Sequence, residues 1–213
     1  MNTARESMLH EVRKNLGRLN APPPPPPIPA RLRIPQMPLA RRIDLLLEKV
    51  AALAGKTLHA KSTAEALAYV AEVISGKTAV ASNTPFLKQA GFTALPNVTS
   101  GITDEKQLRD LCAVTDFGIT SATYALADTG SLVMMAGREE ARLVSLLPPV
   151  HIAIVPAERI LSTIDELYML EPMPGDSTSS MVLITGPSRT ADIEQLLVRG
   201  VHGPGEIYVV VVD

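Results

Sequence analysis

Apolar residues recur at helical spacing near the start of the chain and are followed by a run of prolines. Over residues 4–19 the apolar positions share one face of a helical wheel and predict an amphipathic helix: Met8, Leu9, Val12, Leu16 and Leu19. Six consecutive prolines begin at Pro22 and predict an extended spacer, with a proline-rich recognition ligand as the alternative. The helix must bury its apolar face on its own body, on another protein or on a second copy. A homodimer formed through this N-terminal arm, residues 1–35, is one expected outcome.

From residue 36 onward, apolar runs of strand length alternate with apolar patterns of helical period. The predicted strands comprise residues 57–60, 78–82, 132–136, 151–156, 181–185 and 207–212. The predicted helices comprise residues 43–53, 63–74, 84–89, 104–112, 157–167 and 190–199, and an alanine-rich segment before Asp128 also has a helical composition. Strands that alternate with helices predict an α/β fold in residues 36–213, with an open, mostly parallel, doubly wound sheet and helices on both faces.

Composition supports this fold and restricts the class of function. Hydrophobic residues make up 46% of the 213 residues but aromatic residues only 3%, so the core is aliphatic, as in parallel α/β proteins. The net charge of −2 provides no field for a polyanion, and few aromatic side chains are available for base stacking, so we expect no nucleic-acid partner. No run of eighteen apolar residues or signal peptide is present, and we expect a cytoplasmic protein without a membrane span.

Metal and cluster chemistry held by this chain alone is not expected. Cys112 is the single cysteine, and it cannot by itself hold an iron–sulfur cluster or a thiolate zinc site. None of the four histidines is paired with another at metal-ligand spacing. The sequence therefore predicts no metal site and no cofactor bound by this chain.

Candidate binding residues follow the predicted strands, where ligands bind in open α/β sheets. Gly186, Ser188 and Arg189 follow one strand and open a predicted helix. Unpaired N–H groups, the positive end of a helix and an arginine would together hold a phosphate or carboxylate. An ordinary helix cap is the alternative, because the segment lacks the lysine of a P-loop and the glycines of a dinucleotide fingerprint.

Most of the candidate catalytic and binding side chains lie between residues 117 and 156. Asp128, Thr129 and Gly130 form a turn, and the Asp128 carboxylate is either a catalytic group or a turn-forming side chain. His151 follows two prolines and is a candidate for proton transfer or a satisfied structural histidine. Thr120 and Arg142 complete the predicted pocket, in which Arg142 or Arg189 would hold an anionic group of the ligand.

Five ordered segments resemble the LUD domain family, the family of lactate utilization protein C. They are Gly118–Thr120, Ala125–Val133, Arg142–Val155, Thr185–Glu194 and Gly200–Glu206. The resemblance implies a fold related to the CoA-transferase and ribose-5-phosphate-isomerase group. It also implies a part in oxidising L-lactate to pyruvate together with iron–sulfur partner proteins, which would carry the clusters while this chain binds a small anionic ligand.

Two other functions remain open beside this one. A stand-alone enzyme of the CoA-transferase or formyltetrahydrofolate cyclo-ligase type would use Asp128 as its carboxylate. A module that only completes an assembly would have no chemistry of its own. Whether the chain is an enzyme is therefore not decided by its sequence.

Overall fold

The computed structural model describes residues 4–18, 34–191, 197–200 and 202–213. The chain divides into two units, Met1–Leu32 and Arg33–Asp213, and each is described by itself. In the first unit, α1 (Ala4–Asn15) lies within the range of the predicted N-terminal helix, and none of its residues is buried. The predicted proline spacer lies outside the described residues.

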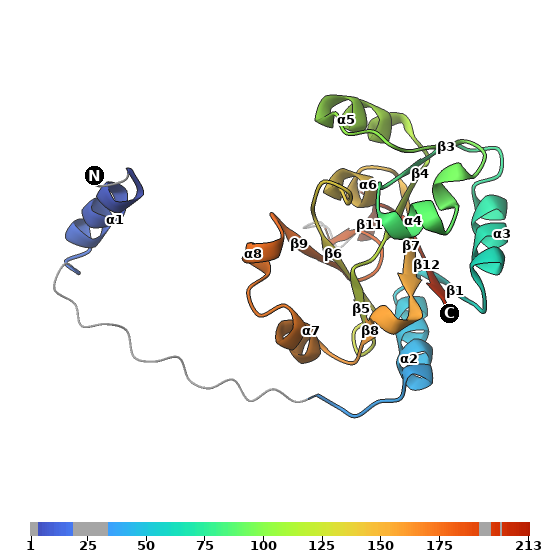
Figure 1. The fold of residues 1–213 in the computed structure, drawn as a ribbon, viewed down its shortest axis with the longest axis horizontal. Helices are drawn as coiled ribbons and strands as arrows, with labels where there is room; N and C mark the ends of the chain where they lie inside the picture. The colour runs from blue at the N-terminus through green and yellow to red at the C-terminus, as the bar shows by residue number, and fades with distance from the viewer. Residues whose placement is uncertain (1–3, 19–33, 192–196, 201) are drawn as a thin grey trace. The chain divides into compact units, whose positions relative to one another are not determined.

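A six-stranded parallel sheet forms the centre of the second unit (Figure 1). Its order is β1 (Lys56–Ala60), β12 (Glu206–Val212), β7 (Val150–Pro156), β4 (Phe117–Ser121), β2 (Ala79–Ala81) and β3 (Val98–Thr99). Every adjacent pair is parallel. The predicted doubly wound parallel sheet is thus confirmed, and its strands are rich in fully buried Val and Ile because both faces are covered.

Helices cover both faces of this sheet, and β7 shows the division. Ile152 and Ile154 point to the face covered by α3 (Thr63–Val73) and α4 (Pro85–Gln89). Ala153 and Val155 point to the opposite face, which packs against α2 (Leu39–Ala52). Capping residues start two of the helices. Ser62 accepts a hydrogen bond from the Glu65 N–H of α3, and Asp104 accepts one from the Gln107 N–H of α5 (Glu105–Val114).

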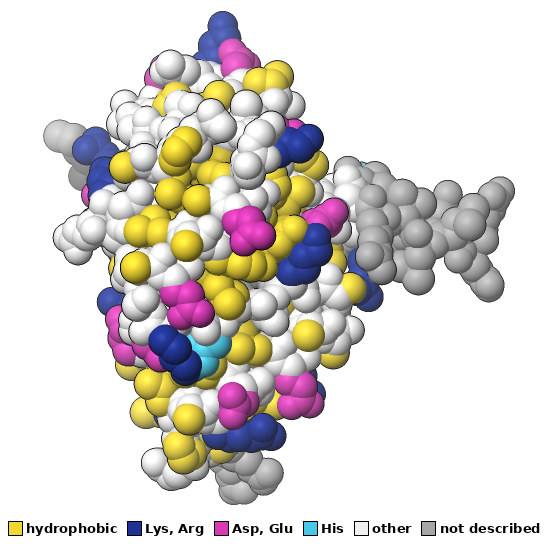
Figure 2. Space-filling model, turned by 90° about the vertical axis from the view of Figure 1, so that its right-hand side faces the viewer, with side chains coloured by type: hydrophobic (Ala, Val, Ile, Leu, Met, Phe, Trp, Pro, Cys, Tyr) yellow, Lys and Arg dark blue, Asp and Glu magenta, His cyan; other side chains and the backbone are white. Residues whose placement is uncertain are grey.

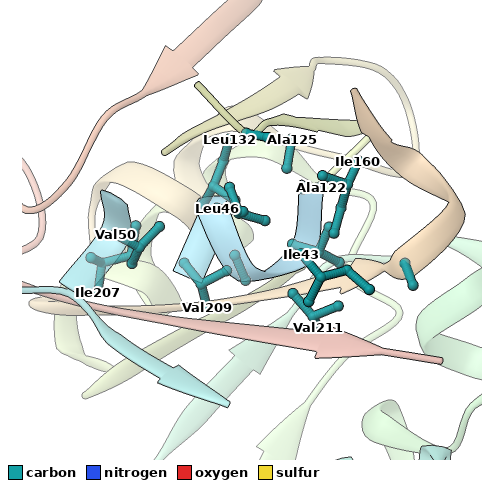
Figure 3. Packing of buried hydrophobic residues seen from close by; sticks show 14 of the residues in the cluster. Ile43, Leu46, Val50, Ala122, Ala125, Leu132, Ile160, Ile207, Val209 and Val211 are labelled. Carbon is teal, nitrogen blue, oxygen red and sulfur yellow. The ribbon is translucent and has the colours of Figure 1, made fainter. Parts of the chain in front are cut away.

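A second sheet lies on the far side of α2, so Ile43, Leu46 and Val50 of this helix are buried between two sheets. Its order is β8 (Ile160–Leu161), β5 (Tyr124–Leu126), β6 (Ser131–Met135) and β9 (Met181–Ile184). Figure 3 shows Leu46 of α2 between Leu132 of the second sheet and Val209 of the first.

Two helix predictions near this sheet were wrong. The alanine-rich segment before Asp128 forms β5 instead, because Ala125 and Ala127 are fully buried against the α2 cluster and packing overrides helix propensity. The predicted helix over residues 157–167 is replaced by the 3₁₀ turn η2 (Ala157–Arg159), then by β8, and only then by α7 (Ile164–Leu170). A short helix, α8 (Pro174–Ser177), leads to β9.

The predicted helix over residues 190–199 was also wrong in its described part. β10 (Arg189–Ala191) and β11 (Leu197–Arg199) pair antiparallel, and residues 192–196 lie outside the described residues. The Gly200 N–H donates to the Ser188 carbonyl, which closes the base of this hairpin. Strand pairing therefore replaces the helix that local propensity favoured.

The surface of the described chain shows mixed charge on the face in view. Figure 2 shows acidic and basic side chains scattered among hydrophobic ones, without a large region of one sign. This agrees with the small net charge of the sequence. Within the described ranges no helix has the length and apolar character needed to cross a membrane.

Candidate functional site

His151 lies near the start of β7 with its imidazole fully buried. Its Nε2 is 2.8 Å from Thr120 Oγ1 on the neighbouring strand β4. Strand register explains the contact, because Gly118 pairs with His151 and Thr120 with Ala153, which places both side chains on one face. Burial lowers the pKa of His151 to about 4, so the imidazole is neutral at neutral pH. Its Nδ1 has no hydrogen-bond partner among the described residues.

A pocket of about 150 Å³ adjoins this histidine at the amino-terminal edge of the parallel sheet. Its polar lining comes from the strands, α6 (Arg142–Leu146) and two loops: Ser145, His151, Thr185, Gly186, Ser188 and His202. We call it the edge pocket. It brings together three of the predicted residues, His151, Gly186 and Ser188, and Thr120 joins them through its contact with His151.

A short chain of hydroxyl groups connects Thr129 to the edge pocket. Thr129 Oγ1 is 2.8 Å from Ser131 Oγ, and Ser131 Oγ is 2.7 Å from Thr185 Oγ1 on the pocket wall. The neighbouring Gly130 has φ +72° and lies against α2, where an added Cβ would be 2.8 Å from Lys49 Cβ. Gly130 therefore allows the turn to approach the helix, and that role is structural.

The other predicted residues lie elsewhere. Asp128 is exposed in its turn, where its N–H donates to the Ser162 carbonyl at 3.2 Å. Arg142 is exposed at the start of α6 and its Nη1 is 3.4 Å from Ser180 Oγ. Arg189 donates from Nη2 to the Leu53 carbonyl at the end of α2. Because β10 follows Gly186–Ser188, the predicted helix N-terminus that was to hold an anion there does not form.

Glu140 was not among the predicted residues, yet it is the most deeply buried acid of the described chain, with 7% of its surface exposed. Ser82 Oγ donates to its Oε2 at 2.7 Å, and the Ser121 N–H also contacts the carboxyl group. Oε1 has no partner among the described residues. Burial outweighs these hydrogen bonds and raises the pKa of Glu140 to about 8.

The sequence contains one weak signal for Glu140. The loop of residues 136–142 follows a predicted strand, which is where site residues are expected. Glu139 and Glu140 are adjacent there, and the sequence does not distinguish the exposed acid from the buried one. The difference comes from the Asn83 N–H, which donates to the Glu139 carbonyl at 2.7 Å and fixes the loop so that the next side chain points inward.

The described residues contain no group of three or more His, Cys, Asp and Glu side chains placed to hold a metal ion.

Comparison with known proteins identifies the family. The model of the LUD domain matches residues 43–212. Lactate utilization protein C of Halalkalibacterium halodurans is 35% identical over 158 residues, which cover 70% of this chain and 69% of that protein. Lactate utilization protein C of an Exiguobacterium species is 40% identical over 110 residues, 49% of this chain and 48% of that protein, so this match spans about half of each.

A solved structure has the same fold. The crystal structure of a duf162 family protein from Deinococcus radiodurans superposes with a TM-score of 0.65 at 19% identity, and the match covers 83% of this chain and 99% of that one. The family match includes both sheets and every candidate site residue discussed above. The chain therefore belongs to the LUD domain family.

Proposed function

We propose that this chain takes part in lactate utilization and that it binds a small 2-hydroxy or 2-oxo acid in the edge pocket. Its relatives are named lactate utilization protein C, which supports the pathway. The observation that carries the choice of site is His151, a fully buried imidazole whose Nδ1 lacks a partner among the described residues and which lines a cavity. A buried polar atom without a partner is unfavourable, and a ligand oxygen would remove that cost.

The size of the edge pocket suits a three-carbon acid. Its volume of about 150 Å³ is large enough to hold lactate or pyruvate. The hydroxyl groups of Thr185 and Ser188 and the ring of His202 line the same pocket and can hydrogen-bond a carboxylate. The oxygen on C2 of the bound acid can then hydrogen-bond with His151.

The tautomer of His151 decides which way a proton moves, and it is coupled to the direction of the hydrogen bond between Nε2 and Thr120 Oγ1. When Nε2–H donates to Thr120 Oγ1, Nδ1 is an acceptor and can take the proton of a 2-hydroxyl group. When Thr120 donates to Nε2, Nδ1–H donates to the oxygen of a 2-oxo acid. A neutral histidine that alternates between these states suits an interconversion of hydroxyl and carbonyl groups.

The redox part of the proposal requires partner proteins. Oxidation of lactate to pyruvate removes two electrons and two protons. His151 accepts the proton of the 2-hydroxyl group, and a two-electron acceptor carried by the partner proteins receives the hydrogen of the C–H bond with its electron pair. We propose that iron–sulfur partner proteins receive these electrons in the cytoplasm. The exposed apolar side chains of Met8 and Val12 on α1, and of Leu16 just after it, would supply a contact for such a partner or for a second copy of the chain.

The test is calorimetric titration of L-lactate and of pyruvate into wild-type protein and His151→Gln. The glutamine amide reproduces the contact of Nε2 with Thr120 but lacks an atom at Nδ1, so the fold is retained and affinity falls at least about tenfold. His59→Gln is the matched control. His59 lies on β1, away from the edge pocket, and pairs with Asp213, so this variant should bind as the wild type does. Equal affinity in the wild type and His151→Gln would refute the site.

Asp128→Asn separates this proposal from the enzyme that uses Asp128 as its carboxylate. Because Asp128 is exposed and outside the edge pocket, we expect Asp128→Asn to bind lactate normally and to support lactate-dependent growth. Loss of both would instead favour the carboxylate enzyme.

A further inference from the structure

The parallel sheet contains a switch in strand order between β2 and β4. From β2 the chain continues to β3, on one side of it, whereas from β4 it continues through the second sheet to β7, on the other side. Connections that leave adjacent parallel strands in opposite directions open a crevice beyond their carboxyl ends. Ligands of open α/β sheets bind in such crevices.

The carboxyl group of Glu140 sits at this switch. Its partners are Ser82, the residue after β2, and the N–H of Ser121, the last residue of β4. The loop that carries Glu140 is thus held to the carboxyl ends of the two strands that diverge. The edge pocket lies beyond the opposite, amino-terminal ends of the strands, so the two locations are distinct.

Two clefts flank the loop that carries Glu140. One, of about 490 Å³, is lined by Ser82, Asn83 and Arg138. The other, of about 500 Å³, is lined by Glu140, Arg109 and Arg142. A cavity of about 10 Å³, the size of one water molecule, also adjoins Glu140 and Arg142. Glu140 therefore lines a cleft large enough for a ligand, and its buried Oε1 lacks a partner in the described chain.

We propose that the cleft lined by Glu140 and Arg142 is a second binding site, which takes an organic acid with two oxygen-bearing groups. One carboxylate of the ligand pairs with Arg142, and an oxygen of its second group accepts a hydrogen bond from the carboxylic acid of Glu140. Arg142 is available for this, because its only hydrogen bond in the described chain is a long one to Ser180. Arg109 forms an exposed pair with Glu105 at 3.5 Å and supplies a second cation.

Because Glu140 is protonated, it suits a ligand that accepts a hydrogen bond rather than a cation. Burial without a paired cation keeps the acid protonated up to about pH 8. Ser82 already donates to Oε2, so a proton on Oε1 points to a position with no acceptor in the described protein. The charged groups around it, Arg109, Arg142 and Glu105 in one cleft and Arg138 and Glu139 in the other, are exposed. Glu140 is therefore the one buried member of this set of charged and titratable groups.

The proposal predicts a linked proton, which succinate can reveal as a probe. Above about pH 8 the wild type must take up a proton to bind, so its affinity for succinate falls about tenfold per pH unit. Glu140→Gln keeps a donor but has no proton to lose, so it binds succinate with an affinity that does not change between pH 7 and 9.5. Glu140→Ala and Arg142→Ala each lose at least about tenfold at pH 7.

Titrations on the wild type, these variants and His151→Gln complete the test. His151→Gln should bind succinate as the wild type does, so failure of the edge pocket and failure of this site give different results. No succinate binding by the wild type would overturn the proposal. A pH dependence retained in Glu140→Gln, or full affinity in Arg142→Ala, would overturn it as well.

Discussion

Each end of the parallel sheet has one buried titratable group. Burial shifts the pKa values of the two groups in opposite directions and so keeps both groups uncharged at neutral pH. At the amino-terminal edge, burial lowers the pKa of His151 to about 4. At the carboxyl edge, burial raises the pKa of Glu140 to about 8. Thr120 on β4 contacts one ring nitrogen of His151, and Ser82 just after β2 donates to one carboxyl oxygen of Glu140. The other nitrogen and the other oxygen have no partner among the described residues. One cause, loss of water, therefore yields an uncharged base at one edge and an uncharged acid at the other.

The two sites also share a structural support. Ser145 of α6 lines the edge pocket and the small cavity beside Glu140. α6 lies directly on Gly118 of β4, where an added Cβ would be 1.9 Å from the Val144 carbonyl oxygen. A helix this close to the strand holds both sites, so moving it should disturb both, whereas changes to Glu140 or His151 should separate them.

The largest effect is expected for Gly118→Ala, which should break both sites together. The new methyl group meets a backbone atom that cannot rotate away, so α6 must shift, at a cost of about 3 kcal/mol in the free energy of unfolding. Urea unfolding measures it, together with loss of lactate and succinate binding. Gly175→Ala is the control, because its Cβ would meet nothing within 4 Å. Wild-type stability in Gly118→Ala would show that α6 is not fixed on the strand.

The pH dependence of stability should separate the two groups. Between pH 4.5 and 6.5 the unfolded chain binds a proton at His151 that the folded protein does not bind, and the folded protein keeps one at Glu140 that the unfolded chain loses. These contributions cancel. Between pH 6.5 and about 8 only Glu140 remains, and stability falls as pH rises by about 1.4 kcal/mol per unit, about 2 kcal/mol in all.

Glu140→Gln should remove this fall, so that the difference in unfolding free energy between variant and wild type grows from pH 6.5 to 8. From pH 4 to 6.5 the variant should gain stability as pH rises, because His151 is then uncompensated. Glu139→Gln, the exposed neighbour, should keep the wild-type profile. Parallel profiles for Glu140→Gln and the wild type would mean that Glu140 is ionised in the folded protein.

A smaller effect is expected for Thr120→Val, which removes the hydroxyl whose hydrogen bond is coupled to the His151 tautomer. It leaves Nε2 buried without a partner and should cost about 1.5 kcal/mol of stability. Lactate binding should weaken while succinate binding stays unchanged, because only the edge pocket is affected. Thr57→Val, on β1, is the control, since no hydrogen bond of its hydroxyl occurs among the described residues. Nitrogen NMR of the imidazole reports the tautomer, and an unchanged spectrum would contradict this role of Thr120.

The sequence predicts the parallel sheet because strands buried on both faces have distinctive apolar runs, as β7 and β12 do. It does not predict the second sheet, because short strands such as β5 and β8 owe their form to contacts with α2, far away in sequence. For the same reason the sequence does not indicate Glu140 as a site residue, whereas it indicates His151 by residue type alone. The burial of that side chain depends on Ser82, 58 residues earlier in the chain.

The smallest effect is expected for Arg189→Ala, which tests how far the edge pocket extends. Arg189 was predicted to hold the ligand, but its guanidinium donates to the Leu53 carbonyl at the end of α2, where a cation favours the helix dipole. Its loss should cost about 0.5 kcal/mol of stability and leave lactate affinity within twofold of the wild type. A tenfold loss of affinity without loss of stability would indicate instead that the carboxylate of the ligand lies near β10. The edge pocket would then need a permanent cation that its present lining of hydroxyls and histidines does not provide.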